Sequence, residues 1–128
     1  MVKIVVDTNF LLIPFQFRVD VFREAERLLE ERTEFVVLSP CVAELKAMSA
    51  GKEGTGRDRR AAKAALTLLE KMPVKVAKAA GAADDAIIDY AVKHKAVVCT
   101  NDRELRKKLR ENGARVIGLR EKSHLAFA

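Results

Sequence analysis

Short apolar runs alternate with segments of helical periodicity along the chain. The runs are rich in Val and end abruptly in polar residues, as buried strands do. They lie at residues 2–6, 35–38, 74–76, 96–99 and 115–119. Between them, apolar residues recur at helical spacing, which predicts helices over residues 21–32, 40–50, 57–71, 84–94 and between residues 102 and 113. The pattern therefore predicts strands and helices in alternation.

This alternation predicts an α/β fold, in which right-handed crossovers place helices on both faces of a parallel sheet. A length of 128 residues fits one domain, so residues 1–128 are expected to form a single domain. In sheets of this kind, binding and catalytic residues collect at the carboxyl ends of the strands. The polar residues that follow each predicted strand are therefore the first candidates for a functional site.

The chain carries 24 Lys and Arg against 18 Asp and Glu, a formal net charge of +6, which favours a polyanionic partner. With one Tyr and no Trp, aromatic stacking is not expected to dominate ligand binding. No run approaches the roughly 18 apolar residues of a membrane helix, and the first strand is too short for a signal peptide. We therefore expect a cytoplasmic protein with no membrane partner.

The two cysteines, Cys41 and Cys99, lie in separate hydrophobic segments without CxxC spacing. Cysteines outside disulfides and metal sites are commonly buried. Both are therefore expected to be free thiols in the core.

Four acidic residues follow the predicted strands or lie near the starts of the helices after them: Asp7, Glu44, Asp85 and Asp102. Each has a local structural role as an alternative. Asp7 can form an Asx turn, and Glu44 is favoured by the dipole of its own helix. Four acids at one edge of a sheet in a basic protein would, however, repel each other unless a cation lies among them.

Helix starts near these acids carry capping signals. Ser39, which precedes a proline, is expected to be an N-cap. One of the adjacent Asp84 and Asp85 is expected to cap the next helix, and we assign Asp84 to that role and Asp85 to the site. Asn101 fits a capping box with the Glu three residues later, which leaves Asp102 free for another role.

Hard cations such as Mg²⁺ and Mn²⁺ accept carboxylate ligands. No His or Cys lies beside these acids in the sequence to suit zinc. A carboxylate-bound divalent cation can activate water and stabilise the charge that develops on a phosphorus centre. An acidic site on a basic protein therefore suggests hydrolysis of phosphodiester bonds.

Four segments carry a further signal through their order and spacing: VVDTN at 5–9, PCVAEL at 40–45, DDAIIDYA at 84–91 and VCTND at 98–102. Together these segments resemble the PIN-domain nucleases over nearly the whole chain. The resemblance implies a three-layer α/β/α sandwich with a five-stranded parallel sheet, whose first strand lies between the second and the fourth. It also implies dependence on Mg²⁺ or Mn²⁺ and cleavage of single-stranded RNA or exposed loops.

Position by position, the resemblance implies that the catalytic residues and metal ligands are Asp7, Glu44, Asp85 and Asp102, and it leaves Asp84 open as a further ligand. The supporting polar residues would be Thr8, Asn9, Thr100 and Asn101. Within the family, these segments look most like archaeal PIN nucleases that process small-subunit ribosomal RNA. The toxin ribonucleases of toxin–antitoxin pairs are a second group that they resemble.

Two basic segments are candidates for RNA contact. One is the glycine-rich arm and the helix after it, with Lys52 and Arg57. The other is the helix after Asp102, with Arg103, Arg106, Lys107 and Lys108. For both segments, a solvated surface without a ligand is the alternative.

These observations predict an endoribonuclease in which one or two Mg²⁺ or Mn²⁺ ions activate a water molecule for attack on phosphorus. The expected partner is single-stranded RNA or structured precursor ribosomal RNA, and a homodimer is compatible with the sequence. The alternatives are a toxin ribonuclease and an RNA-binding assembly factor with a PIN fold and no turnover.

Overall fold

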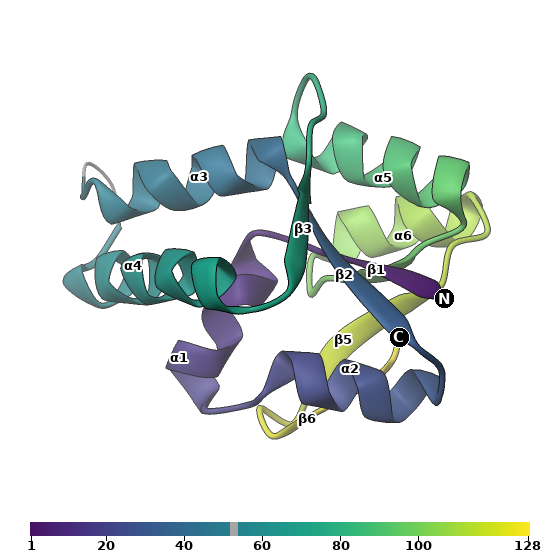
Figure 1. Cartoon of the computed structure of the whole chain (residues 1–128), viewed down its shortest axis with the longest axis horizontal. Helices are drawn as coiled ribbons and strands as arrows, with labels where there is room; N and C mark the ends of the chain where they lie inside the picture. The colour runs from purple at the N-terminus through teal and green to yellow at the C-terminus, as the bar shows by residue number, and fades with distance from the viewer. Residues whose placement is uncertain (52–53) are drawn as a thin grey trace.

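A six-stranded sheet runs through the computed structural model, which describes residues 1–51 and 54–128 (Figure 1). The strands lie in the order β3-β2-β1-β4-β5-β6. Their bounds are β1 Val2–Val6, β2 Thr33–Leu38, β3 Val74–Ala77, β4 Val97–Cys99, β5 Val116–Arg120 and β6 His124–Phe127. The first five strands are parallel, and β1 lies between β2 and β4, as expected.

The sixth strand corrects the prediction of a five-stranded, wholly parallel sheet. It returns antiparallel to β5 and forms one edge of the sheet. The turn between these strands holds Glu121 and Lys122 at positive φ, 55° and 57°. Tight hairpins of this kind are usually marked by Asn-Gly or Asp-Gly. Neither Glu121 nor Lys122 signals such a turn, so the hairpin is not visible in the sequence.

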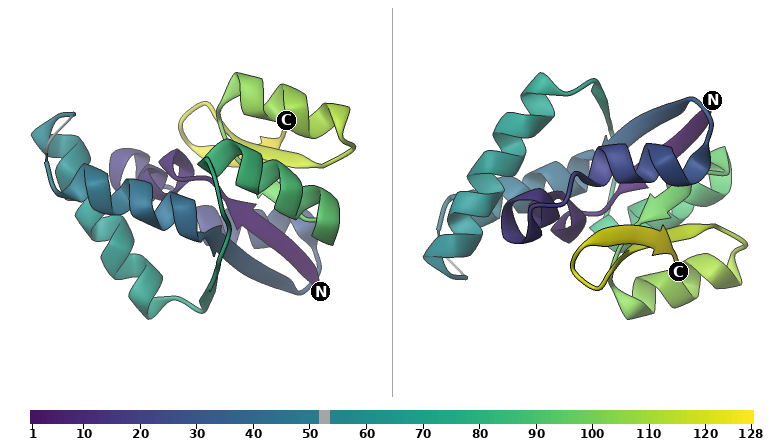
Figure 2. Two further views of the ribbon diagram at one scale, coloured as in Figure 1. Left: turned by 90° about the horizontal axis from the view of Figure 1, so that it is seen from above. Right: turned by 90° about the horizontal axis from the view of Figure 1, so that it is seen from below.

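Helices cover both faces of the sheet. Helix α2 lies on one face and α5 and α6 lie on the other, whereas α3 and α4 pack together beyond the carboxyl ends of the strands (Figure 1 and Figure 2). The bounds are η1 Asn9–Leu12 (a 3-10 helix), α1 Ile13–Phe17, α2 Val21–Leu29, α3 Ser39–Ser49, α4 Gly56–Lys71, α5 Ala83–His94 and α6 Arg103–Glu111. The α/β/α architecture is confirmed. Among the described residues, no helix is both long and apolar enough to cross a membrane.

The two central strands, β1 and β4, contribute fully buried residues to the core. Ile4, Val5 and Val6 of β1 are at most 1% exposed, and all of β4 is buried. Strands that are buried on both faces read as continuous apolar runs, which explains why the sequence reveals them. Pairing continues past both strands, because the Asp7 N–H donates to the Cys99 carbonyl at 3.0 Å. The polar residues after β1 and β4 are therefore held side by side.

Cys41 and Cys99 are buried and free, which confirms the prediction. Burial raises the pKa of the Cys41 thiol to about 11 and also raises the pKa of Cys99. Because the thiolate is the reactive form of cysteine, neither residue is suited to nucleophilic catalysis at neutral pH.

Candidate active site

Asp7, directly after β1, is the centre of the candidate site. It is buried, with 7% of the residue exposed. Its Oδ1 accepts a hydrogen bond from the Thr8 N–H at 2.8 Å, and its Oδ2 accepts one from the Thr100 hydroxyl at 2.8 Å. Burial raises the pKa of Asp7, the two hydrogen bonds oppose this shift, and the charges of Asp84 and Glu44 add to it. The carboxylate is thus firmly held, and a cation beside it would favour its charged form.

Thr100 connects the ends of the two central strands. It is fully buried, and its hydroxyl both donates to Asp7 Oδ2 and accepts from the Asp102 N–H at 3.1 Å. One hydroxyl therefore fixes the Asp7 carboxylate relative to the start of α6. This contact gives Thr100 a physical reason for lying beside the acids.

Asp102 is the N-cap of α6, which corrects the assignment of a capping box to Asn101. Asp102 Oδ1 accepts a hydrogen bond from the Leu105 N–H at 3.0 Å. Asn101 Oδ1 instead accepts from the Leu119 N–H at 2.8 Å and joins the start of the helix to β5. Asn and Asp are about equally good N-caps, so the sequence alone did not show which one begins the helix. Capping through Oδ1 leaves Asp102 Oδ2 available for a ligand.

Neither Asp84 nor Asp85 caps α5, contrary to the prediction. The N-cap position is an alanine without a side-chain bond, and both acids are exposed in the first turn of the helix. Desolvation raises the pKa of Asp84, and the charges of Asp102 and Glu44 raise it further. Asp84 therefore lies in the electrostatic field of the other site acids, a position that the sequence predicts for Asp85.

Glu44 is exposed on α3, and its charge acts on both Asp7 and Asp84. A contact between segments 40 residues apart fixes the start of its helix: the Ser39 hydroxyl donates to the Ala79 carbonyl at 3.2 Å and accepts from the Ala79 N–H at 3.0 Å. Ser39 is thus the first residue of α3 and not its N-cap, which corrects the prediction. This contact holds the loop before α5 against α3, and no local sequence signal could have revealed it.

Thr8 and Asn9 follow Asp7 in the chain. Thr8 is 2% exposed, and its N–H holds the Asp7 carboxylate. Its hydroxyl oxygen is buried and has no hydrogen-bond partner among the described residues, and the Cys41 sulfur lies beside it. Asn9 is exposed at the start of η1. Thr8 therefore acts on the site mainly through its backbone.

The acids fit a hard divalent cation through their chemistry. Their side chains offer carboxylate oxygens, and mutual repulsion contributes to the raised pKa of Asp7 and Asp84. Within residues 1–51 and 54–128, no three ligand side chains lie close enough to hold an ion by themselves. Mg²⁺ is commonly held by one or two carboxylates while it keeps several water molecules. The acids lie farther apart than in a site where three side chains bind the ion directly, and this spacing fits an ion that keeps several of its water molecules.

The basic helix α6 presents one lysine toward the acids. The charge of Lys108 opposes the raised pKa of Asp84, which places its ammonium group near that carboxylate. Arg103 and Lys107 are exposed, and Arg106 is half-buried. The helix thus offers positive charge at the border of the site.

The second predicted basic segment is partly engaged within the protein. Arg57 lies on α4, and its guanidinium donates a hydrogen bond to the Gln16 carbonyl at 3.4 Å. This bond links α4 to α1 and uses part of the capacity of Arg57 for a ligand. Lys52 lies outside the described residues.

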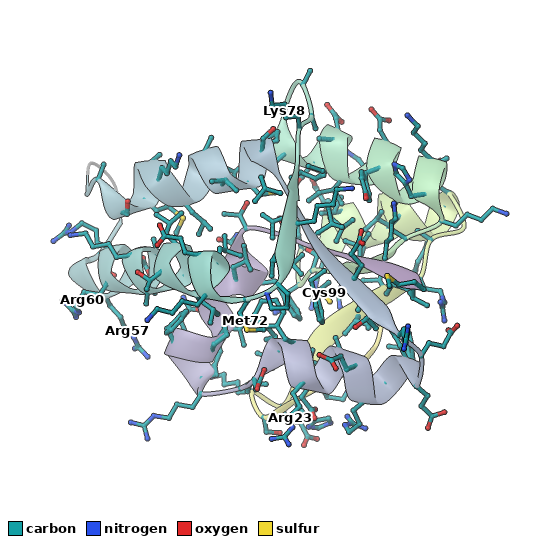
Figure 3. All side chains as sticks on the ribbon, in the orientation of Figure 1. Arg23, Arg57, Arg60, Met72, Lys78 and Cys99 are labelled. Carbon is teal, nitrogen blue, oxygen red and sulfur yellow. The ribbon has the colours of Figure 1, made fainter. Side chains whose placement is uncertain are left out.

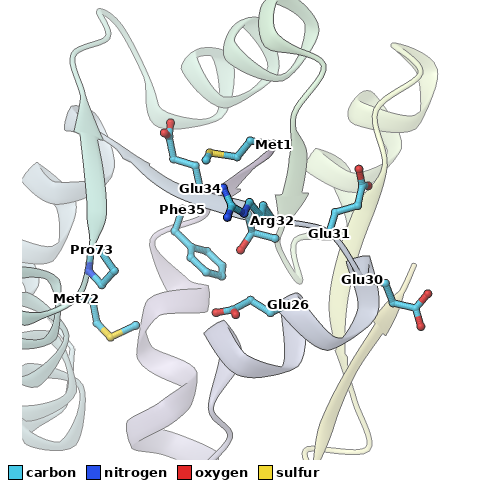
Figure 4. Close-up of a pocket in the computed structure, with 10 residues that line it drawn as sticks. Met1, Glu26, Glu30, Glu31, Arg32, Glu34, Phe35, Met72 and Pro73 are labelled. Atoms are coloured by element: carbon cyan, nitrogen blue, oxygen red, sulfur yellow. The ribbon is translucent and has the colours of Figure 1, made fainter.

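A cavity of about 790 Å³ lies at the amino ends of β1, β2 and β3, opposite the acidic residues (Figure 4). Its charged lining residues are Glu26, Glu30, Glu31, Arg32 and Glu34. Four glutamates against one arginine would repel a phosphate chain. This cavity is therefore not part of the candidate site.

Comparison with known sequences identifies the family. The family model of the PIN-like domain matches residues 4–122, and the chain belongs to this family. It is 37% identical over 125 residues to Ribonuclease VapC4 of Methanocaldococcus jannaschii, covering 97% of this chain and 95% of the relative. It is 31% identical over 117 residues to Ribonuclease VapC9 of Archaeoglobus fulgidus, covering 91% of this chain and 82% of the relative.

Solved structures share the fold. The PIN domain endonuclease Utp24 matches with a TM-score of 0.78 and 23% identity, over 98% of this chain and 90% of that chain. VapBC2 from Rickettsia felis, solved bound to a DNA fragment from its promoter, matches with a TM-score of 0.62 and 14% identity, over 91% and 98% of the two chains. At these identities the structures bear on the fold alone.

Proposed function

We propose that the chain is a metal-dependent endoribonuclease that hydrolyses phosphodiester bonds of single-stranded RNA. The observation that carries this proposal is the acidic edge of the sheet, where Asp7 is buried and the charges of Asp84 and Glu44 raise its pKa beyond the effect of burial. Because the acids repel each other, they favour a divalent cation among them. The net charge of +6 on the whole chain favours a polyanionic partner. Two relatives named as ribonucleases support RNA as the substrate.

The proposed ligands of Mg²⁺ or Mn²⁺ are Asp7, Glu44, Asp84 and Asp102. When bound, the ion would stabilise charge on the phosphoryl oxygens and lower the pKa of water. Thr100 holds the Asp7 carboxylate in place, and Lys108 offers a positive charge for the RNA backbone. Asp85, the ligand predicted from the sequence, takes an outer position in this proposal. Hydrolysis would leave a 5′-phosphate and a 3′-hydroxyl.

Metal dependence is the test of this proposal. The purified chain is expected to cleave a labelled single-stranded RNA with Mn²⁺ or Mg²⁺ and to stop when EDTA is added. Without a cation between them, the carboxylates and the RNA phosphate repel each other. Products are resolved by gel electrophoresis, and excess Mn²⁺ should restore cleavage. The Asp7→Asn variant, purified in the same way, controls for contaminating nucleases. Equal cleavage with and without EDTA would contradict the proposal.

Two cellular roles remain within this activity. Processing of small-subunit ribosomal RNA is the role that the sequence segments favoured, whereas both named relatives carry the VapC name. The VapC name, and the VapBC2 pairing, favour a toxin ribonuclease that is held by an antitoxin partner. We therefore propose the toxin role as the second candidate.

Expression in a host cell distinguishes these roles. A toxin is expected to arrest growth, and coexpression of a neighbouring antitoxin gene should relieve the arrest. A processing nuclease should instead sediment with precursors of the small ribosomal subunit and leave growth unchanged. RNA binding without cleavage in any divalent metal would identify an assembly factor without turnover.

Replacing Lys107 and Lys108 by Ala is expected to weaken RNA binding while metal-dependent cleavage stays detectable. If both ammonium groups contact phosphate, the slope of log affinity against log salt should become shallower by about 1.4, because each contact to a single strand contributes about 0.7. Fluorescence anisotropy at several salt concentrations measures the slope. Alanine at Lys63 and Lys71, both exposed on α4, is the control for lost charge. An unchanged slope would mean that this helix face is only solvated.

A further inference from the structure

A basic groove of about 480 Å³ runs between the edge strand β3 and helix α5. The residues that line it come from β1, β3, the loop after β3, and α5. Its charged lining residues include Lys3, Lys75, Lys78, Asp89 and Lys93. With four lysines against one aspartate, the groove presents an excess of positive charge.

The register of the sheet brings two of these lysines to one face. Val5 of β1 pairs with Val36 of β2, and Val36 pairs with Lys75 of β3. Because side chains alternate between the faces of a strand, Lys3 points to the same face as Val5, Val36 and Lys75. Helix α5 packs on β1 and β2, and it adds Lys93 to the groove.

The positive charge of the groove is not neutralised by ion pairs. In the part of the chain that the structure describes, the one ion pair joins Arg27 and Glu24 on α2. Asp89 also lines the groove, and Glu34 lies opposite Lys3 in the strand register, but among the described residues neither acid forms an ion pair with these lysines. A bound polyanion would therefore relieve repulsion among the lysines.

The groove also holds the only tyrosine of the chain. Tyr90 stacks on His94 with ring centroids 4.1 Å apart and an angle of 35° between the rings, and Lys3 Nζ lies 6.0 Å from the centroid of Tyr90. Desolvation and the charges of Lys3, Lys93 and Lys75 lower the pKa of His94, so its ring is neutral at neutral pH. Aromatic rings among cationic side chains offer a stacking surface for a base beside contacts to phosphate.

The groove opens beside the acidic site. Ala79 in its wall is hydrogen-bonded to Ser39 at the start of α3, the helix that carries Glu44. Lys78 lies on the loop that joins β3 to α5 (Figure 3), and this loop lies next to the first turns of α3 and α5 (Figure 1). A polymer that leaves the acids along this loop would reach the groove.

We propose that this groove binds single-stranded RNA that extends from the acidic site, with the lysines on its phosphates and Tyr90 available to a base. The inference rests on the proposed function and adds an RNA-binding surface separate from α6. It also explains how a chain with few aromatic residues could hold a flexible strand, since phosphate contacts supply most of the affinity for nucleic acids.

The test is a Lys75→Ala, Lys78→Ala double variant beside the Lys63→Ala, Lys71→Ala control, which loses the same charge on α4. Binding of a labelled single-stranded RNA is measured by fluorescence anisotropy in EDTA over a range of salt. The groove variant is expected to show a slope about 1.4 shallower and a Kd roughly 25-fold higher in about 0.1 M salt, as loss of two phosphate contacts requires. The control should change neither by a comparable amount. A Lys75→Arg, Lys78→Arg variant should retain binding.

Cleavage assays in Mn²⁺ separate this inference from the proposed function. The groove variant should lose kcat/KM on a long RNA and keep it on a short RNA that reaches no farther than the acids. If the wild type binds RNA without cleaving it, and the groove variant loses this binding, the result would support the groove and refute the proposed function. Unchanged binding in the groove variant, or equal weakening in the control, would overturn the groove. Polyglutamate that binds the wild type but not the groove variant, with RNA binding unchanged, would also overturn it and indicate an acidic protein partner.

Discussion

Replacing Asp7 by Asn is expected to lower RNA cleavage by about 100-fold or more while RNA binding persists. Asn keeps the size of the side chain, and its oxygen can still accept the hydrogen bond from the Thr8 N–H. It lacks the charge that would hold a divalent cation. Loss of even a residue that only supports a metal ligand typically lowers metal affinity or activity by about 10- to 100-fold. The kcat/KM in Mn²⁺ and the Kd for RNA measure the two effects. Cleavage near the wild-type rate would mean that Asp7 only shapes a turn.

The same substitution should stabilise the protein in metal-free buffer at neutral pH. Burial raises the pKa of Asp7 above its ordinary value of 3.8. The protonated acid therefore favours folding below pH 3.8, and this contribution is lost as the pH rises through the higher pKa of the folded state. The Tm of Asp7→Asn should exceed that of the wild type at pH 7, and the difference should shrink as the pH falls toward 3.8. Glu70→Gln on the exposed surface of α4 is the control, and a lower Tm for Asp7→Asn at pH 7 would contradict the argument.

Replacing Asp84 by Asn is expected to impair cleavage by about tenfold or more, and replacing Asp85 by Asn should have a smaller effect. Desolvation, together with the charges of Asp102 and Glu44, raises the pKa of Asp84, so its carboxylate belongs to the group that a cation would neutralise. About tenfold is the lower end of the loss in activity or metal affinity that follows when the surroundings of a metal ligand are changed. Initial rates over a titration of Mn²⁺ should show a higher metal requirement for Asp84→Asn.

These two variants are matched controls for each other. Asp84 and Asp85 are adjacent and exposed in one helical turn, neither caps the helix, and each substitution removes one negative charge. A difference between their rates therefore reports position relative to the site and not helix stability or net charge. Equal rates would place both acids outside the metal site, and a greater loss with Asp85→Asn would restore the assignment made from the sequence.

The sequence by itself determined the central sheet and the edge on which the site lies. Strand β4 and the second half of β1, from Ile4 to Val6, are buried on both faces, and such segments must be apolar. The first polar residues after them, from Asp7 and from Thr100 onward, therefore mark the carboxyl ends of parallel strands. Because those ends meet at one edge of the sheet, the sequence could place Asp7 and Asp102 together without any tertiary information.

The local roles of the same residues depended on tertiary structure. Successive residues of a helix point about 100° apart, so the rotation of α5 decides whether Asp84 or Asp85 faces the other acids. Burial of the helix face that carries Ala83 and Ile87 sets that rotation, and Ile87, three residues after Asp84, lies on the same side of the helix as Asp84. The choice of Asp102 as the N-cap likewise depends on β5, whose backbone takes the Asn101 side chain.

Contacts between distant segments decided the rest. Ser39 meets Ala79 across 40 residues, and the basic groove joins side chains from β1, β3 and α5 that have no common pattern in the sequence. A local sequence pattern reports which face of an element is buried. It does not report which surfaces the packed elements bring together, because that depends on the register of the strands and the packing of the helices.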